Sequence, residues 1–329
     1  SLSGANSTPT IAKQVLVSDR DRHIIAFGCD TESEPGVQDP LAIRFSSQES
    51  LTDWAATATN TAGELRLGSG SEIVMAIETR QQVLVFTDES LYAMQYLGPP
   101  FTFGVNLVSE NITTMGPLAA IPVEDNVYWM GLKEFYAYGG TVQRLPCTVR
   151  DYVFDDINLD QREKIVASSN TSFSEVWWFY PSASSSVNDR YVVYNYQQQI
   201  WYYGTLSRSF WMDRGIFDQP IAAGPNNYLY SQETGFDDDG SAFTAYIESS
   251  QIDIGDGDKF AFIRRMIPDV TFRGSTAASP SANFTIKTRN FPGGNYLQST
   301  EKQVTKTASV PVEQFTEQVH LRLRGRSFA

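Results

Sequence analysis

The sequence predicts an all-β fold, and three observations support this. Aromatic residues make up 13% of the 329-residue chain and accompany many Ser, Thr, Asn and Gln residues, a mixture typical of pleated, half-buried strands. Short apolar runs are separated by polar turns, which is the pattern of β-hairpins. Such hairpins recur along the chain. A repeated unit of roughly four strands every 40 to 50 residues predicts a β-propeller.

Five segments predict hairpins, each with an apolar strand, a polar turn and a second apolar strand. In the first segment, VLVSDRDRHIIAF, the turn is expected at residues 18–22. The other four have turns of similar length, which hold residues that favour tight turns. The five segments are residues 15–27, 83–94, 127–140, 191–204 and 221–235.

Further apolar runs predict the remaining strands of each unit. These runs are residues 41–45, 65–67, 72–77 and 175–180. Helix is expected only as one or two turns in each of two places, residues 12–17 and 160–166. A long β-sandwich is the main alternative fold, but two continuous facing sheets would not by themselves require similar hairpins to recur at this spacing.

Charge divides the chain into two parts. Residues 1–258 hold 14 Lys and Arg against 34 Asp and Glu, a net charge of -20, whereas residues 259–329 hold 11 against 4, a net charge of +7. The character of the sequence begins to change after about residue 240, and we expect propeller blades in residues 1–240. Residues 241–329 are expected to form a smaller, basic β extension, which either completes the propeller or forms a small β-sandwich.

The basic extension contains VHLRLR at residues 319–324, in which apolar residues alternate with His320, Arg322 and Arg324. This alternation predicts a strand with one apolar and one cationic face. The cationic face is either solvated or in contact with an acidic surface. That surface would be a neighbouring copy of the chain or the phosphate backbone of DNA.

Catalytic motifs are weak throughout the sequence. His23 and His320 are the only histidines, and neither belongs to a recognisable nucleophile motif. Cys29 and Cys147 lie far apart, which predicts two free buried thiols and supports neither a disulfide framework nor a zinc site. The glycine-rich LGSG stretch lacks the Lys and the helix of a phosphate-binding loop. We expect no catalytic residue and no cofactor.

The stretch DIGDGD is the strongest metal candidate, with Asp253, Asp256 and Asp258 as its possible ligands. Closely spaced carboxylates with intervening glycines can wrap oxygen atoms around a hard cation such as calcium. The stretch lacks the acidic residue that ends a twelve-residue calcium loop, so a tight acidic turn is the favoured interpretation.

Tryptophans within or next to the predicted strands have two possible roles. Strand alternation would send about half of them between the blades, where they pack. A minority facing outward would be available to bind sugar or a partner protein. These residues are Trp129, Trp177, Trp178, Trp201 and Trp211.

Five phrases together resemble a family of tail structural proteins from short-tailed bacteriophages, the tail nozzle or hub proteins. The resemblance covers about residues 15–272 and is most specific in the long third phrase. The phrases are DRDRHIIAFG, LAIRFSSQESLTDW, NVYWMGLKEFYAYGGTVQRLPCTVRDYVFDDIN, EVWWFYPS and DIGDGDKFAFIRRMIPDVTF.

The resemblance implies a β-propeller protein that forms a homo-hexameric ring below the portal and the tail adaptor. Such a ring is a non-enzymatic part of the virion tail, assembled in the host cytoplasm, and it holds and releases the genome through a central channel. Members of the family have a further Gly- and Trp-rich N-terminal segment and continue beyond RLRGRSFA, so a partial chain is expected. The acidic net charge predicts a channel wall along which DNA slides without sequence-specific binding.

Two other classes of function stay open at this point. One is a carbohydrate-binding or carbohydrate-cleaving propeller for host-surface recognition, since the 38 acidic residues allow a carboxylate pair. The other is a monomeric β-sandwich adhesin. No apolar run is long enough to span a bilayer, so no membrane span is expected.

Overall fold

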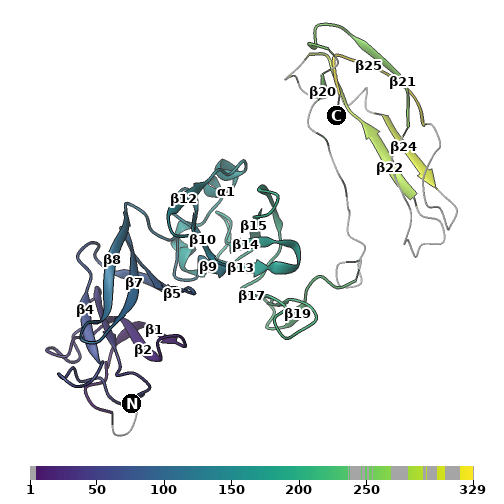
Figure 1. Ribbon diagram of the computed structural model, residues 1–329. Helices are drawn as coiled ribbons and strands as arrows, with labels where there is room; N and C mark the ends of the chain where they lie inside the picture. Colours follow the sequence, from purple (N-terminus) through teal and green to yellow (C-terminus); the bar gives the residue numbers. More distant parts are fainter. Residues whose placement is uncertain are drawn as a thin grey trace. The chain divides into compact units, whose positions relative to one another are not determined.

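The computed structural model describes residues 5–235, 237, 246, 249, 252–253, 255–267, 281–291, 294, 302–307 and 319–328. It divides into two compact units, Ser1–Gly235 and Phe236–Ala329. The boundary predicted at residues 240/241 lies outside the described residues. The two units are considered separately below (Figure 1).

The first unit is a series of four-stranded antiparallel sheets followed by a three-stranded sheet. In every sheet, strands that follow one another in sequence pair with one another (Figure 1). Sheet 1 comprises β1 (Ala12–Ser18), β2 (His23–Cys29), β3 (Ala42–Phe45) and β4 (Gly63–Arg66), and sheet 2 comprises β5 (Ile73–Glu78), β6 (Val83–Thr87), β7 (Ser90–Gly98) and β8 (Thr102–Glu110). Sheet 3 comprises β9 (Ala120–Val123), β10 (Asn126–Met130), β11 (Phe135–Tyr138) and β12 (Val142–Leu145). Sheet 4 comprises β13 (Val166–Asn170), β14 (Glu175–Tyr180), β15 (Arg190–Asn195) and β16 (Ile200–Thr205), and sheet 5 comprises β17 (Phe210–Met212), β18 (Ile221–Ala223) and β19 (Leu229–Ser231).

The second sheet shows why the first four residues of β6, VLVF, are all apolar. Successive side chains of a strand point to opposite faces. Val83 and Val85 pack in the core shared with sheet 1, whereas Leu84 and Phe86 pack in the core shared with sheet 3. The inner strand β6 is therefore buried on both faces, whereas β7 and β8 also expose residues, Leu97 and Leu107 among them.

The fourth sheet follows the same rule. Trp178 and Tyr180 of β14 belong to the core shared with sheet 3, while Trp177 and Phe179 belong to the core shared with sheet 5. Sheets packed face to face in sequence order, each a four-stranded meander, are the blades of a β-propeller. The predicted fold class, an all-β propeller with a smaller C-terminal β extension, is confirmed.

All five predicted hairpins are present. Residues 15–27 form β1 and β2, and the other four segments form the pairs β6–β7, β10–β11, β15–β16 and β18–β19. The helical turn expected at residues 12–17 is wrong, because these residues form β1 and pair with β2. Residues 160–166 begin in the 3₁₀ helix η1 (Leu159–Lys164) and end in β13.

Two short helices escaped the sequence interpretation. Helix α1 (Arg150–Asp155) buries one side chain, Val153, in the core between sheets 3 and 4. This packing stabilises the short helix. The 3₁₀ helix η2 (Thr171–Phe173) joins β13 to β14. None of the helices in the described residues has the length and apolar character needed to cross a bilayer.

The described residues of the second unit also form antiparallel strands. They pair as β20–β26–β23, β21–β25 and β22–β24. Their bounds are β20 (Ile252–Asp253), β21 (Ala261–Met266), β22 (Ser281–Ile286), β23 (Thr288–Arg289), β24 (Lys302–Thr307), β25 (Val319–Gly325) and β26 (Ser327–Phe328).

Asp30, at the end of β2, fastens the N-terminal segment to sheet 1. Its buried carboxylate accepts hydrogen bonds from Thr10 N (2.8 Å), Thr10 Oγ1 (2.8 Å), Ile11 N (3.1 Å) and Gly36 N (2.8 Å). Burial by itself raises the pKa of a carboxyl group, but the hydrogen bonds outweigh it and lower the pKa of Asp30 to about 2.

We predict that Trp178→Ala lowers the free energy of unfolding of the first unit by about 3 to 5 kcal/mol. The change empties a fully buried site and removes the bond from Trp178 Nε1 to the Ala119 carbonyl, 3.0 Å long. All six tryptophans lie within residues 1–235, so near-ultraviolet circular dichroism during denaturant unfolding follows this unit. Phe101→Ala, at a side chain that is 72% exposed, should stay within about 0.5 kcal/mol of the wild type.

We also predict that Asp30→Asn lowers the free energy of unfolding by about 2 kcal/mol at pH 7. Because the folded pKa of Asp30 lies below that of the unfolded chain, its stabilisation is present above about pH 4 and is lost as the pH falls towards 2. Unfolding midpoints at pH 7 and pH 3 should show the gap between variant and wild type narrowing at the lower pH. An equal gap at both values would contradict this assignment.

Candidate functional site

A polar cleft of about 870 Å³ lies where turns of the first three sheets meet. Its walls come from the β1–β2 turn, the β5–β6 turn, the β9–β10 turn and the end of β11. These segments are far apart in sequence and are brought together by the stacking of the sheets. The charged residues that line it are Asp19, Arg20, Glu78, Arg80, Glu124 and Asp125.

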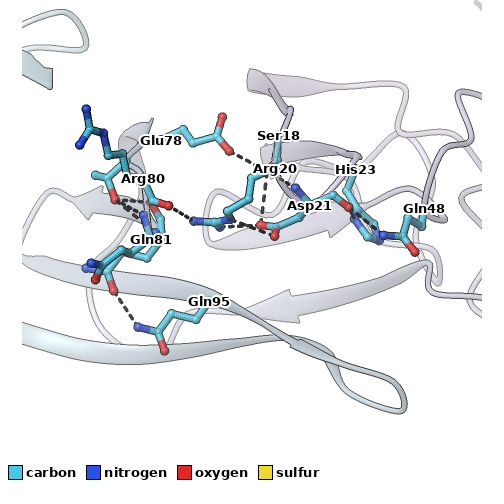
Figure 2. Close-up of polar contacts among 11 residues, drawn as sticks. Ser18, Arg20, Asp21, His23, Gln48, Glu78, Arg80, Gln81 and Gln95 are labelled. Atoms are coloured by element: carbon cyan, nitrogen blue, oxygen red, sulfur yellow. Dashed lines mark hydrogen bonds and ion pairs between the residues drawn. The ribbon is translucent and has the colours of Figure 1, made fainter. Parts of the chain in front are cut away.

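Arg20 is the central cross-link of this cleft (Figure 2). Its guanidinium donates to both carboxylate oxygens of Asp21, from Nε at 3.0 Å and from Nη2 at 2.5 Å, while Nη1 donates to the Arg80 carbonyl at 3.0 Å. The hydrogen bond to Asp21 raises the pKa of Arg20, with burial acting in the opposite direction. One side chain therefore joins the turn of sheet 1 to the turn of sheet 2.

Ser18 and Glu78 form a second bridge between the same two sheets. The Ser18 hydroxyl donates to Glu78 Oε1 at 2.6 Å and accepts a bond from Asp21 N at 3.3 Å (Figure 2). A hydroxyl has one proton to donate, so the short bond to Glu78 defines its orientation. Ser18 is fully buried, which gives this bond geometric rigidity.

Amide groups extend the network to sheet 3. Gln95 Nε2 donates to Gln82 Oε1 at 2.8 Å, and Gln82 Nε2 donates to the Tyr138 hydroxyl at 2.6 Å. Arg80 also pairs with Asp125 at 2.7 Å, although both side chains are about three-quarters exposed. The exposed pair contributes little stability, whereas the Gln82 bond is buried and directional.

The polar lining of the cleft can form hydrogen bonds with a polar ligand. No histidine or cysteine is among the described residues that line it. The Thr79 hydroxyl donates to the Gln82 carbonyl at 2.7 Å, so its proton is directed at the turn rather than at a base. A nucleophile needs a base within hydrogen-bond reach. Glu78 accepts a hydrogen bond from the Ser18 hydroxyl, but Ser18 is fully buried.

His23 lies beneath the cleft and is buried. Its Nδ1 is 2.6 Å from the Asp21 carbonyl oxygen and its Nε2 is 3.2 Å from Thr61 Oγ1. Its ring packs edge-on against Phe103 with centroids 5.1 Å apart. Burial lowers the pKa of His23, and the bond to the Asp21 carbonyl offsets only part of that effect. His23 is a packed, hydrogen-bonded structural residue.

The metal candidates lie in the second unit. Asp253 ends β20, and Asp256 and Asp258 follow in a turn, all with exposed side chains. Within the described residues, no group of three or more His, Cys, Asp or Glu side chains is arranged to hold a metal ion.

The tryptophans are all packing residues. Trp129 and Trp178 are fully buried, and the other three are at most 9% exposed. Packing between blades, the favoured interpretation of these residues, is confirmed, and both faces of sheets 3 and 4 are covered by neighbouring sheets. Of the two free cysteines, Cys29 is buried and Cys147 is half-buried, and burial raises the pKa of each thiol to about 11.

Glu175 is a buried carboxylate that the sequence interpretation missed. It accepts bonds from Trp177 Nε1 at 2.9 Å and from the Tyr202 hydroxyl. Burial and the bond to Glu175 together raise the pKa of Tyr202. The sequence signal for this residue is its place as the single acidic residue at the start of the apolar run EVWWFY. An acidic residue on a buried strand requires hydrogen-bond partners.

The second unit presents a cationic surface, here called the basic ribbon, on the paired strands β21 and β25. His320, Arg322 and Arg324 are exposed at alternate positions of β25, as predicted. A hollow of about 830 Å³ is lined by Phe262, Arg264, His320 and Arg322. The basic ribbon comprises Phe262, Arg264, Arg265, His320, Arg322 and Arg324.

Comparison with known proteins identifies no family for this chain. No family model matches the chain, and no curated protein matches it. Among solved structures it is similar to Hsv2 from Kluyvelomyces marxianus, with 7% sequence identity and a TM-score of 0.37 over 92% of this chain and 84% of that chain. A similarity of this size says nothing of activity or partners.

We predict that His23 makes stability depend on pH below about 6.5, the pKa of an unperturbed histidine. Because the folded pKa of His23 is lowered, the unfolded chain binds the extra proton first, and stability is lost as the pH falls. His23→Gln should be less stable at pH 7.5, through lost packing, but its stability should change less between pH 7.5 and 5. Identical pH slopes in urea unfolding of both proteins would rule out this role.

Proposed function

We propose that this chain is a structural, ring-forming component of a short-tailed phage tail, a nozzle or hub through which the genome passes. The observation that carries the proposal is the combination of stacked, cross-linked blades with a strongly acidic charge. Residues 1–235 hold 14 Lys and Arg against 27 Asp and Glu, a net charge of -13. The sequence resemblance to tail nozzle proteins supports the same role.

Acidic subunits suit the passage of DNA for an electrostatic reason. Like charges repel, so a channel wall of negative sign makes few lasting contacts with the phosphate backbone. The duplex would slide without sequence-specific binding, and retention before ejection would require a physical constriction. The chain acts in this proposal as a homo-hexamer in the virion tail, assembled in the host cytoplasm beneath the tail adaptor, and it has no enzymatic activity.

A second candidate is a propeller that binds or cleaves host-surface carbohydrate. The polar cleft of sheets 1 to 3 favours it, since carboxylates, amides and guanidinium groups can hydrogen-bond sugar hydroxyls. The buried tryptophans count against it, because none is free to stack on a sugar ring.

We predict a six-fold ring with an open centre. The purified chain should be weighed in solution by light scattering, and any assembled species imaged by electron microscopy, both alone and with the tail adaptor. A ring is expected because copies of the chain that meet head to tail through two different surfaces form a ring when the rotation between them closes.

The contrary result is a chain that stays monomeric in every condition and is absent from isolated tails. Carbohydrate binding would then become the leading proposal. Glu78→Gln in the cleft would test it, against Asp218→Asn, an exposed acidic position outside the cleft, as the control. Loss of sugar binding or hydrolysis only in the first variant would support the carbohydrate role.

A further inference from the structure

Three guanidinium groups of the basic ribbon, those of Arg264, Arg322 and Arg324, are exposed on the paired strands β21 and β25. Arg265 and His320 are directly opposite one another across the two strands. Within the described part of the chain, Arg264, Arg322 and Arg324 form no ion pair with a carboxylate. Arg322 and Arg324 lie two residues apart on the same face of β25, and like charges close together on a sheet are destabilising, so these guanidinium groups gain from an acidic partner.

Aromatic rings lie among these guanidinium groups. Arg324 and Arg326 stand over the ring of Phe260 at 4.2 and 4.7 Å from its centroid, and Arg264 is 5.6 Å from that of Phe262. Phe262 is 55% exposed and lines the hollow. Arginine and aromatic side chains around a concave seat are the residues that carry most of the energy in protein interfaces.

A complementary surface exists on the first unit, at the end of sheets 1 and 2 away from the polar cleft. There the Ile73 amide donates to the Pro40 carbonyl at 2.9 Å and so joins the loops of the two sheets. The acidic rim is defined as the five exposed carboxylates at or near this end, Glu34, Glu64, Asp88, Glu89 and Glu110.

Cations close to the acidic rim do not neutralise it. Lys13 is paired with Glu72 at 2.7 Å, and Arg66 is paired with Asp39 at 2.7 Å. Both of these cations therefore already have carboxylate partners outside the set of five. The rim keeps an excess of negative charge that matches the sign and the exposed character of the basic ribbon.

We propose that the basic ribbon of one copy binds the acidic rim of the next copy. The inference rests on the proposed ring and names the surfaces that would build it. Two different surfaces meeting in a head-to-tail manner give a ring when the rotation closes. Duplex DNA is the competing partner for the same guanidinium groups, and a measurement of DNA binding distinguishes the two.

The test uses charge reversal on each surface of the full chain. The ribbon variant carries Arg264→Glu and Arg322→Glu, and the rim variant carries Glu89→Lys and Glu110→Lys. Matched controls change the same charge elsewhere on exposed positions: Lys133→Glu with Arg214→Glu, and Asp160→Lys with Asp218→Lys. Circular dichroism confirms that each variant is folded before its mass is measured.

Each single-surface variant should associate at least about tenfold more weakly than the wild type, while the controls match it. Mixing the two variants should restore assembly, because the native ribbon of the rim variant meets the native rim of the ribbon variant, and the two reversed surfaces also carry opposite charges. A chain that carries both reversals should regain assembly. The mixing result is informative even where isolated rings do not form.

Other outcomes overturn the inference in distinguishable ways. Rings formed by the ribbon variant as readily as by the wild type would remove these surfaces from the interface and leave the proposed ring standing. Absence of assembly in the mixture, together with loss of duplex DNA binding by the ribbon variant, would assign the ribbon to nucleic acid. A wild type that is monomeric even with the adaptor and is missing from tails would remove the proposed function itself.

Discussion

The need to bury both faces of every inner sheet governs this structure. Adjacent residues of a strand point in opposite directions, so a strand that is apolar throughout must be covered twice. Val83 and Leu84 are adjacent in the sequence, yet their side chains belong to different cores. A sheet covered twice requires a neighbour on each side, and repeating the requirement produces a row of blades. The outer face of sheet 1 is covered instead by a smaller cluster that includes Trp54.

Apolar packing is non-directional, so the stacking of blades does not by itself align their ends. Directional hydrogen bonds between polar groups at the strand ends align the blades. Arg20 reaches the backbone of the neighbouring turn, and Gln82 connects sheet 2 to Tyr138 of sheet 3. Such bonds tolerate little displacement, whereas apolar contacts tolerate sliding. The polar cleft is thus explained as the place where three blades are held in register, whether or not it binds a ligand.

Local signals in the sequence were sufficient for the hairpins, because turn chemistry and apolar runs act over a few neighbouring residues. The same signals failed for residues 12–17, which pair as a strand only because β2 lies beside them. For the tryptophans these signals favoured packing but could not name the partners, because those lie in sheets more than 30 residues away, as the bond from Trp178 to Ala119 across 59 residues shows. The polar cleft could not be predicted at all, since its residues come from three sheets. Glu175 could have been suspected from its place in an apolar run, but not its partners.

The positive charge of the second unit is confined to its C-terminal part and does not give the unit a net charge. Residues 236–329 hold 11 Lys and Arg and 11 Asp and Glu, so the second unit is neutral as a whole although residues 259–329 carry +7. A neutral unit does not steer partners from afar, and at physiological ionic strength charges are screened beyond about 8 Å. The attraction of the basic ribbon therefore acts only on surfaces already near contact. Shape and the exposed Phe262 then contribute to the choice of partner alongside the guanidinium groups.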